Sequence, residues 1–180
     1  MREPWNVLVS ISEGRYREAI TKLRRFGTVH KTSFYSVLAV EADDPDAMLE
    51  ELKLEQENNP EAVRWLGHIA PARDIFFFQS PEEFERKARE HVRPLLDKLA
   101  GKTFFVRIHR RGFKGRLSSQ AEEQFLDGFI LDTLREKGTP AAMDFQDPDF
   151  VIEIETLAQE AGLAVWSREQ RKRYPFLKLH

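Results

Sequence analysis

The sequence predicts an α/β (α+β) protein of two small domains. Short runs of β-branched and aromatic residues alternate with longer segments whose apolar residues recur every three or four positions, the spacing of an amphipathic helix. Serine, aspartate and proline mark several helix starts, and glycine or proline marks several ends. A length of 180 residues can bury a core in one domain of ordinary size or in two small ones, and we favour two.

The first predicted domain, residues 1–79, follows the order strand, helix, strand, strand, helix, strand. Its first helix ends at Gly27, and its second opens with Asp44 as the cap and Pro45 in the first turn. The predicted elements are the strand Trp5–Ile11, the helix Tyr16–Phe26, the strands Val29–Lys31 and Phe34–Val40, the helix Asp44–Asn58, and at least one strand within Val63–Phe78. This order is that of a ferredoxin-like domain, in which two helices cover one face of an antiparallel sheet.

The second predicted domain, residues 80–180, is an α/β unit with a basic tail. Capping boxes at Ser80–Glu83 and Ser119–Glu122 open two of its helices. Its predicted strands are Thr103–His109, Phe150–Glu155 and Gly162–Trp166.

The stretch Lys102–Arg116 changes from an apolar strand into a basic loop with two glycines. Its cations meet no acidic residue inside the stretch, and such charge at a strand end suits phosphate better than a protein core. Gly112 and Gly115 let the backbone approach a phosphate closely, and Phe113 between them could stack on an unpaired base. The candidate RNA-binding residues here are Lys102, Arg107, Arg110, Arg111, Gly112, Phe113, Lys114, Gly115 and Arg116.

Two alternatives remain for this loop. It could be a solvated loop whose phenylalanine packs against the core. Gly112–Gly115 also matches the bare GxxG of a KH domain, but that loop joins two helices, whereas a strand enters this one.

A second basic cluster lies near the C-terminus, around the aromatic segment Tyr174–Phe176. One interpretation is a second wall that contacts phosphates, with Tyr174 available for stacking. The alternative is a charged tail whose aromatic residues anchor it to the domain. The candidate RNA-binding residues of this cluster are Arg168, Arg171, Lys172, Arg173, Tyr174 and Lys178.

The sequence gives little sign of a catalytic or cofactor site. There is no cysteine, the five histidines are scattered, and no phosphate-binding loop or dinucleotide motif is present, so we expect no metal and no cofactor. Glu153 and Glu155 share the outer face of a strand, where we expect a solvated pair. His109 beside Arg110 could act as a general base on RNA, although the sequence indicates no partner for it, and a small RNA-processing or RNA-modifying enzyme therefore remains an alternative.

The net charge of −2 hides a separation of acidic and basic segments. Acid gathers in Glu41–Glu61, which is either a solvated helix or a docking face for a basic partner. No apolar run approaches the roughly 20 residues of a membrane span, and the N-terminus lacks the features of a secretory signal. We therefore expect a cytoplasmic protein with no membrane partner.

Three features in this order and spacing resemble a THUMP domain preceded by the ferredoxin-like domain that usually accompanies one. They are the strand with a basic exit at Lys102–Arg116, the segment Asp147–Ile154 in which Asp-Pro-Asp leads into a strand, and the tail from Ser167 to Phe176. Together they cover nearly the whole chain.

The resemblance implies a function in tRNA modification or processing. THUMP domains occur in 4-thiouridine synthetases, tRNA guanosine methyltransferases and archaeosine-pathway enzymes, where the two small domains grip the acceptor end of tRNA. A catalytic domain normally follows, whereas this sequence ends at His180. The resemblance therefore favours a non-catalytic tRNA-binding protein, similar to the adaptors that present tRNA to a separate enzyme such as a cytidine acetyltransferase.

Overall fold

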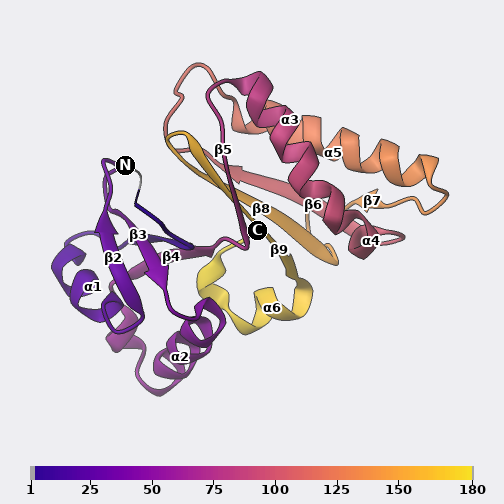
Figure 1. Ribbon diagram of the computed structural model, residues 1–180. Coiled ribbons are helices and arrows are strands. Elements are labelled where there is room, and N and C mark those ends of the chain that lie inside the picture. The colour runs from indigo at the N-terminus through magenta and orange to yellow at the C-terminus, as the bar shows by residue number, and fades with distance from the viewer. Residues whose placement is uncertain (1–2, 180) are drawn as a thin grey trace. The chain divides into compact units, whose positions relative to one another are not determined.

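The structure is a computed structural model that describes residues 3–179, and it divides into two compact units (Figure 1). The first unit contains the chain up to Ala72 together with Arg171–Lys178, and the second contains Arg73–Gln170 together with Leu179. Each unit combines helices with one β-sheet, which confirms the predicted α+β class. Among residues 3–179, no helix combines the length and the apolar character of a membrane-spanning segment.

The first unit has the predicted ferredoxin-like arrangement. Its strands form an antiparallel sheet in the order β2-β3-β1-β4. The elements are β1 (Val7–Ile11), α1 (Tyr16–Leu23), β2 (Gly27–Lys31), β3 (Val37–Ala42), α2 (Pro45–Asn58), the 3₁₀ turn η1 (Pro60–Val63) and β4 (Leu66–Pro71). Asp44 caps α2, because its side chain accepts a hydrogen bond of 3.1 Å from the backbone N–H of Ala47.

The second unit is built on a mixed sheet in the order β5-β9-β8-β6-β7, in which β6 runs parallel to both of its neighbours. The elements are β5 (Asp74–Phe77), α3 (Pro81–Val92), the 3₁₀ turn η2 (Arg93–Leu95), α4 (Leu96–Leu99), β6 (Thr103–His109), α5 (Ser119–Glu136), β7 (Ala142–Met143), β8 (Phe150–Leu157) and β9 (Glu160–Ser167). Helices α3 and α5 lie along one face of the sheet (Figure 1) and close a core that includes Phe84, Leu126 and Ile152. After β9 follow α6 (Arg168–Arg173) and the 3₁₀ turn η3 (Pro175–Leu177).

The division into units differs from the expected boundary after Gln79. β5 precedes that boundary in the sequence, yet its backbone pairs with β9 of the second sheet, with Asp74 opposite Leu163. The segment Arg171–Lys178 was expected in the second domain and groups with the first unit. The reason is physical: the pairing partner of a four-residue strand depends on distant residues, which its own sequence does not specify.

Helix α5 covers the part of the β6 edge that β7 leaves unpaired. β7 pairs only with Thr103 and Phe104, so the N–H groups farther along this edge need other acceptors. The carboxylate of Glu123 accepts a hydrogen bond of 2.8 Å from the backbone N–H of Ile108. Asp127, one turn later on α5, accepts one from Val106. Carboxylate side chains of α5 thereby accept the hydrogen bonds of β6 N–H groups that have no partner strand.

This arrangement, together with the packing of α3 on α5, leaves two acidic groups with raised pKa values. Glu122 is only 5% exposed and lies against Glu82 and Glu85 of α3, so burial and these like charges raise its pKa to about 7. Burial and the charge of Glu123 likewise raise the pKa of Asp127 to about 7. Both groups therefore keep their proton in the folded protein up to about pH 7, well above the range of an ordinary carboxyl group.

We expect Glu122→Gln to stabilise the protein at pH 8 but not at pH 4. A carboxyl whose folded pKa lies above its unfolded value contributes stability below the unfolded pKa, and that contribution is lost as the pH rises through about 7. Unfolding by denaturant at pH 8 should show a gain of about 1–3 kcal/mol. Glu136→Gln, at an exposed position of the same helix, is the control. An equal effect of Glu122→Gln at both pH values would contradict the argument.

Candidate nucleic-acid interface

β6 separates its side chains onto two faces of the sheet before it enters the basic loop. Phe104, Val106 and Ile108 belong to the core under α3 and α5. The alternate residues Arg107 and His109 point to the opposite face, since successive side chains in a strand point to opposite sides. Strand β8 has the same alternation, and its register places Glu153 beside Arg107 and Glu155 beside His109.

The carboxylate of Glu155 binds Arg111, the second residue after β6. The guanidinium Nη2 lies 3.3 Å from Oε1 of Glu155, and the two side chains are 14% and 3% exposed. The backbone N–H of Arg111 also donates to the hydroxyl of Thr156 at 2.8 Å. The basic stretch contains no acidic residue in its sequence, but in the folded protein one of its arginines binds the carboxylate of Glu155. Arg111 therefore has a structural partner within the second unit.

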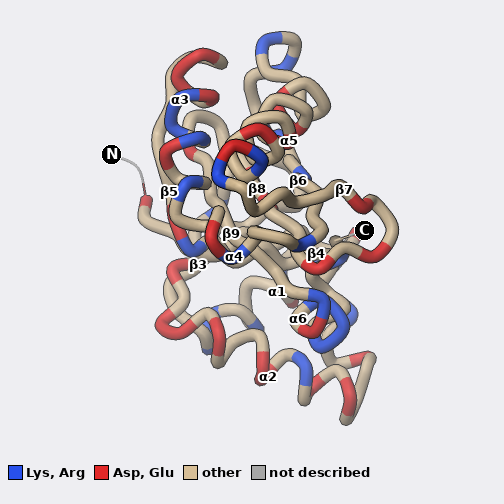
Figure 2. The backbone as a smooth tube through the Cα atoms, turned by 90° about the vertical axis from the view of Figure 1, so that its right-hand side faces the viewer, with Lys and Arg blue, Asp and Glu red and all other residues tan. Residues whose placement is uncertain are grey.

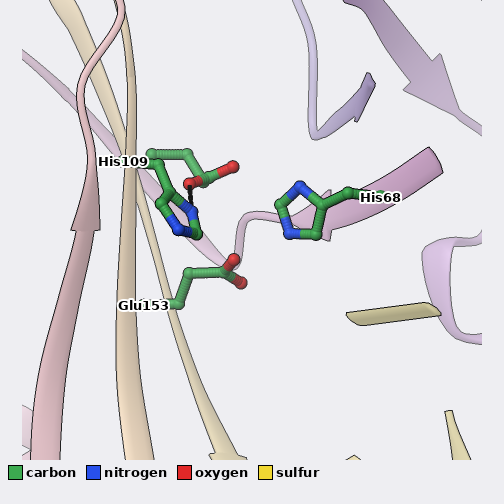
Figure 3. Close-up of side chains that lie close together, drawn as sticks. His68, His109 and Glu153 are labelled. Atoms are coloured by element: carbon green, nitrogen blue, oxygen red, sulfur yellow. Dashed lines mark hydrogen bonds and ion pairs between the residues drawn. The ribbon is translucent and has the colours of Figure 1, made fainter. Parts of the chain in front are cut away.

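The same carboxylate binds His109. Nδ1 of the imidazole lies 2.5 Å from Oε2 of Glu155 (Figure 3), and this contact raises the pKa of His109 above its ordinary value, although burial opposes it. The partner that the sequence did not indicate for His109 is thus Glu155.

Glu153 and Glu155 are not the solvated pair that the sequence predicts. They are 1% and 3% exposed, and Oε1 of Glu153 accepts a hydrogen bond of 3.0 Å from the indole N–H of Trp166. His109, Glu153 and Glu155 each bring a potential metal-ligand atom within 4.8 Å of the others. Arg111 and Trp166 donate hydrogen bonds to these carboxylates.

The tip of the basic loop turns Phe113 toward the core. Gly112 and Gly115 have φ values of 100° and 77°, and Phe113 itself has a φ of 55°. The Phe113 ring lies 5.1 Å from that of Phe78, centroid to centroid, and packs against the core of the second unit. Packing, the alternative left open by the sequence, therefore describes Phe113 in this structure.

Three cations remain at the surface of this loop: Arg110, Lys114 and Arg116, which we call the loop cations. Lys114 and Arg116 are exposed, and Arg110 is half-exposed. The Arg116 guanidinium lies over the Phe113 ring, 4.8 Å from its centroid, and the Arg110 guanidinium donates to the carbonyl of Gly112. Lys102 precedes the seven-residue β6, about 25 Å from Arg110 along the strand, and so does not belong to this group.

The C-terminal basic cluster is also largely paired. Arg168 binds Asp147 at 2.9 Å and Asp149 at 3.2 Å, which ties the end of β9 to the start of β8. In the first unit, Arg173 binds both oxygens of Glu50, at 2.6 and 2.7 Å. The Tyr174 hydroxyl donates to the same carboxylate, and these contacts lower the pKa of Glu50 to about 2.

The other members of this cluster differ in exposure. Lys172 and Lys178 are exposed, Arg171 is half-buried, and the neighbouring Phe176 is buried. Figure 2 shows α6 with blue segments for its Lys and Arg residues beside a red one for its acidic residue. Because Tyr174 binds Glu50 and Phe176 is buried, the anchored-tail alternative describes these aromatic residues.

No protein-family model and no curated protein matches the chain, but solved structures match its fold. PH1313 from Pyrococcus horikoshii Ot3 superposes with a TM-score of 0.58 and 18% identity, over 89% of this chain and 53% of that one. A 4-thiouridine synthetase in an RNA complex with bound ATP superposes with a TM-score of 0.51 and 19% identity, over 91% of this chain and 42% of that one. TrmN from Thermus thermophilus superposes with a TM-score of 0.56 and 18% identity, over 89% of this chain and 44% of that one. The chain thus spans about half or less of these structures, and the likeness shows a THUMP-like fold.

We expect Glu155→Gln to lower the pKa of His109 toward its ordinary value, as measured by NMR titration of the imidazole protons. The stability that the His109–Glu155 contact contributes is present below pH 6.5 and is lost as the pH rises through the raised folded pKa. The substitution should therefore cost more at pH 6 than at pH 9, about 3 kcal/mol at the lower pH because it breaks a buried pair. Glu169→Gln on α6 is the exposed control. An unchanged His109 titration would contradict the role of Glu155.

Proposed function

We propose that the protein binds tRNA at its acceptor end, with the loop cations as phosphate contacts. The observation that carries the proposal is the combination of a THUMP-like fold over about nine-tenths of the chain with exposed cations at the exit of β6. One of the matched structures is a 4-thiouridine synthetase–RNA complex, which supports RNA as the ligand.

The geometry of the loop suits phosphate. Guanidinium groups form paired hydrogen bonds with phosphate oxygens. Because Arg116 lies on the Phe113 ring, its side chain is already ordered and loses less conformational entropy on binding. The positive φ values at Gly112 and Gly115 bend the backbone without side chains that would keep a phosphate away. Phe113 supports the loop from inside.

We further propose that binding is the whole function of this chain, which would present tRNA to a separate modifying enzyme such as a cytidine acetyltransferase. The internal pairing of Arg111, Arg168 and Arg173 supports an architectural role for these cations. The same pairing reduces the expected phosphate contacts to the exposed cations of the loop and the tail.

Replacing Lys114 and Arg116 together by alanine should weaken tRNA binding about 10-fold at physiological salt. Each cation that contacts a phosphate contributes about one unit to the slope of log K against log salt, so the slope should flatten by about two units. Arg111 is left intact because its loss would remove the guanidinium that binds Oε1 of the buried Glu155.

The matched control is Arg135→Ala with Lys137→Ala. It removes the same charge at the other end of α5, and both residues are exposed. Binding should be measured with intact tRNA and with tRNA that lacks its unpaired 3′ end. An unchanged affinity of a folded Lys114/Arg116 variant would remove the loop from the interface, and equal binding of the two RNAs would contradict recognition of the acceptor end.

A second candidate function is an RNA-processing or RNA-modifying enzyme centred on His109. The observation that favours it is the His109–Glu155 contact, because a carboxylate on Nδ1 orients an imidazole for acid–base catalysis at its other nitrogen. The His109 side chain is 40% exposed.

If this candidate is correct, the purified protein will cleave tRNA or change its mass during incubation. His109→Ala should then abolish the reaction while tRNA binding persists, since the loop cations are unchanged. Glu169→Ala, at an exposed position of α6, serves as the control. Turnover that survives in His109→Ala would exclude this residue, and the lack of any turnover would favour the binding function.

A further inference from the structure

The first unit has a hollow of about 610 Å³ between the β1–α1 loop and the connection from β2 to β3. This volume falls within the range of small-molecule sites. Its wall includes Ser12, Tyr16, Ser33, Phe34, Tyr35 and Ser36, and it contains no charged residue.

Tyr35 lies on the β2–β3 connection with 86% of its surface exposed. The connection is held in place on both sides of this residue. The Thr32 hydroxyl donates to the carbonyl of Val37 at 2.8 Å and accepts from the N–H of Phe34 at 3.1 Å. The carbonyl of Ser36 accepts from the N–H of Ile11 in β1 at 2.8 Å. The ring is therefore presented by a backbone that is already ordered, which lowers the entropic cost of binding.

The wall also presents hydroxyl groups that the fold does not use. The side chains of Ser12, Ser33 and Ser36 have no hydrogen-bond partner within residues 3–179. A hydroxyl both donates and accepts, so it can match either kind of polar group on a ligand. Thr32, in contrast, is committed to the turn itself.

These features select the chemistry of the ligand. The absence of charge in the wall does not suit a phosphate or a metal ion. A ligand with a planar π-face and polar groups at its edge can stack on the exposed phenol ring and form hydrogen bonds with the neighbouring hydroxyls. Nucleobases have this form. In a duplex both faces of a base are covered by its neighbours, so the base must be unpaired.

We propose that this hollow binds one unpaired nucleobase of the RNA, stacked on Tyr35 with its polar edge toward the serine hydroxyls. The proposal rests on the RNA binding proposed above. Arg15, whose guanidinium lies 3.9 Å from a carboxylate oxygen of Glu18, and Lys31 adjoin residues of the wall in sequence, and in this proposal they are the cations for the phosphates that flank the base.

The test measures affinity for two RNAs, a hairpin with a single-stranded 3′ end and the same hairpin without it. Tyr35→Ala should weaken binding of the first RNA about 10-fold, the loss typical of one stacked base, and should leave the blunt hairpin unaffected. Tyr35→Phe keeps the ring and should bind both RNAs as the original protein does. Leu54→Ala, a change of another exposed side chain in this unit, is the control.

The outcomes separate the two proposals. If the unchanged protein binds RNA and Tyr35→Ala binds each RNA with the same affinity as the unchanged protein, the hollow is not a base site while RNA binding stands; a protein partner at Tyr35 would give this result. Equal weakening for both RNAs would also overturn the base site. If the unchanged protein binds no RNA, the proposed function fails, and titration with adenosine followed by NMR decides on the hollow: shifted signals at Tyr35 and Ser36 support a nucleoside site, and unshifted signals overturn it.

Discussion

The carboxylate of Glu155 binds Arg111 and His109 at the point where β6 leaves the sheet, and the course of the basic loop depends on it. Both of its oxygens are used, one for each cation. The carbonyl of Arg111 is fixed as well, since it accepts the N–H of Ala158 at 2.8 Å. A buried pair of this kind contributes little net stability because desolvation offsets the attraction, but it penalises every arrangement that separates the partners. The loop therefore starts from a defined position and direction.

Pairing divides the cations of this protein into two groups. Arg111, Arg168 and Arg173 each bind a carboxylate from a distant part of the sequence and join elements of one unit. Lys114 and Arg116 lie on the loop surface, where a phosphate can reach them. The net charge of −2 does not reveal this division, because the affinity for an anion depends on local groups of exposed cations and not on the mean charge.

Local patterns in the sequence predicted most of the fold but not the partners of its charged residues. The strand–helix order, the cap at Asp44 and the alternation in β6 and β8 depend on neighbouring residues, which periodicity and capping rules describe. Glu155 lies 44 residues after Arg111, and Glu50 lies 123 residues before Arg173, so no local rule connects them. Alternation assigned Glu153 and Glu155 to the face opposite the core, but it could not show that this face buries them.

Two aromatic residues on loops illustrate how the surroundings decide between packing and recognition. Phe113 has a positive φ that turns its ring back toward Phe78, so the ring packs against the core of the second unit. Tyr35 has no ring within stacking distance in the described part of the chain, and the turn that presents it is closed by Thr32 and Ser36. If RNA is the ligand, charge at the loop cations and stacking at Tyr35 are contributed by different units. The two contributions depend differently on salt, since screening weakens the first and leaves the second largely unaffected, so their separate measurement distinguishes them.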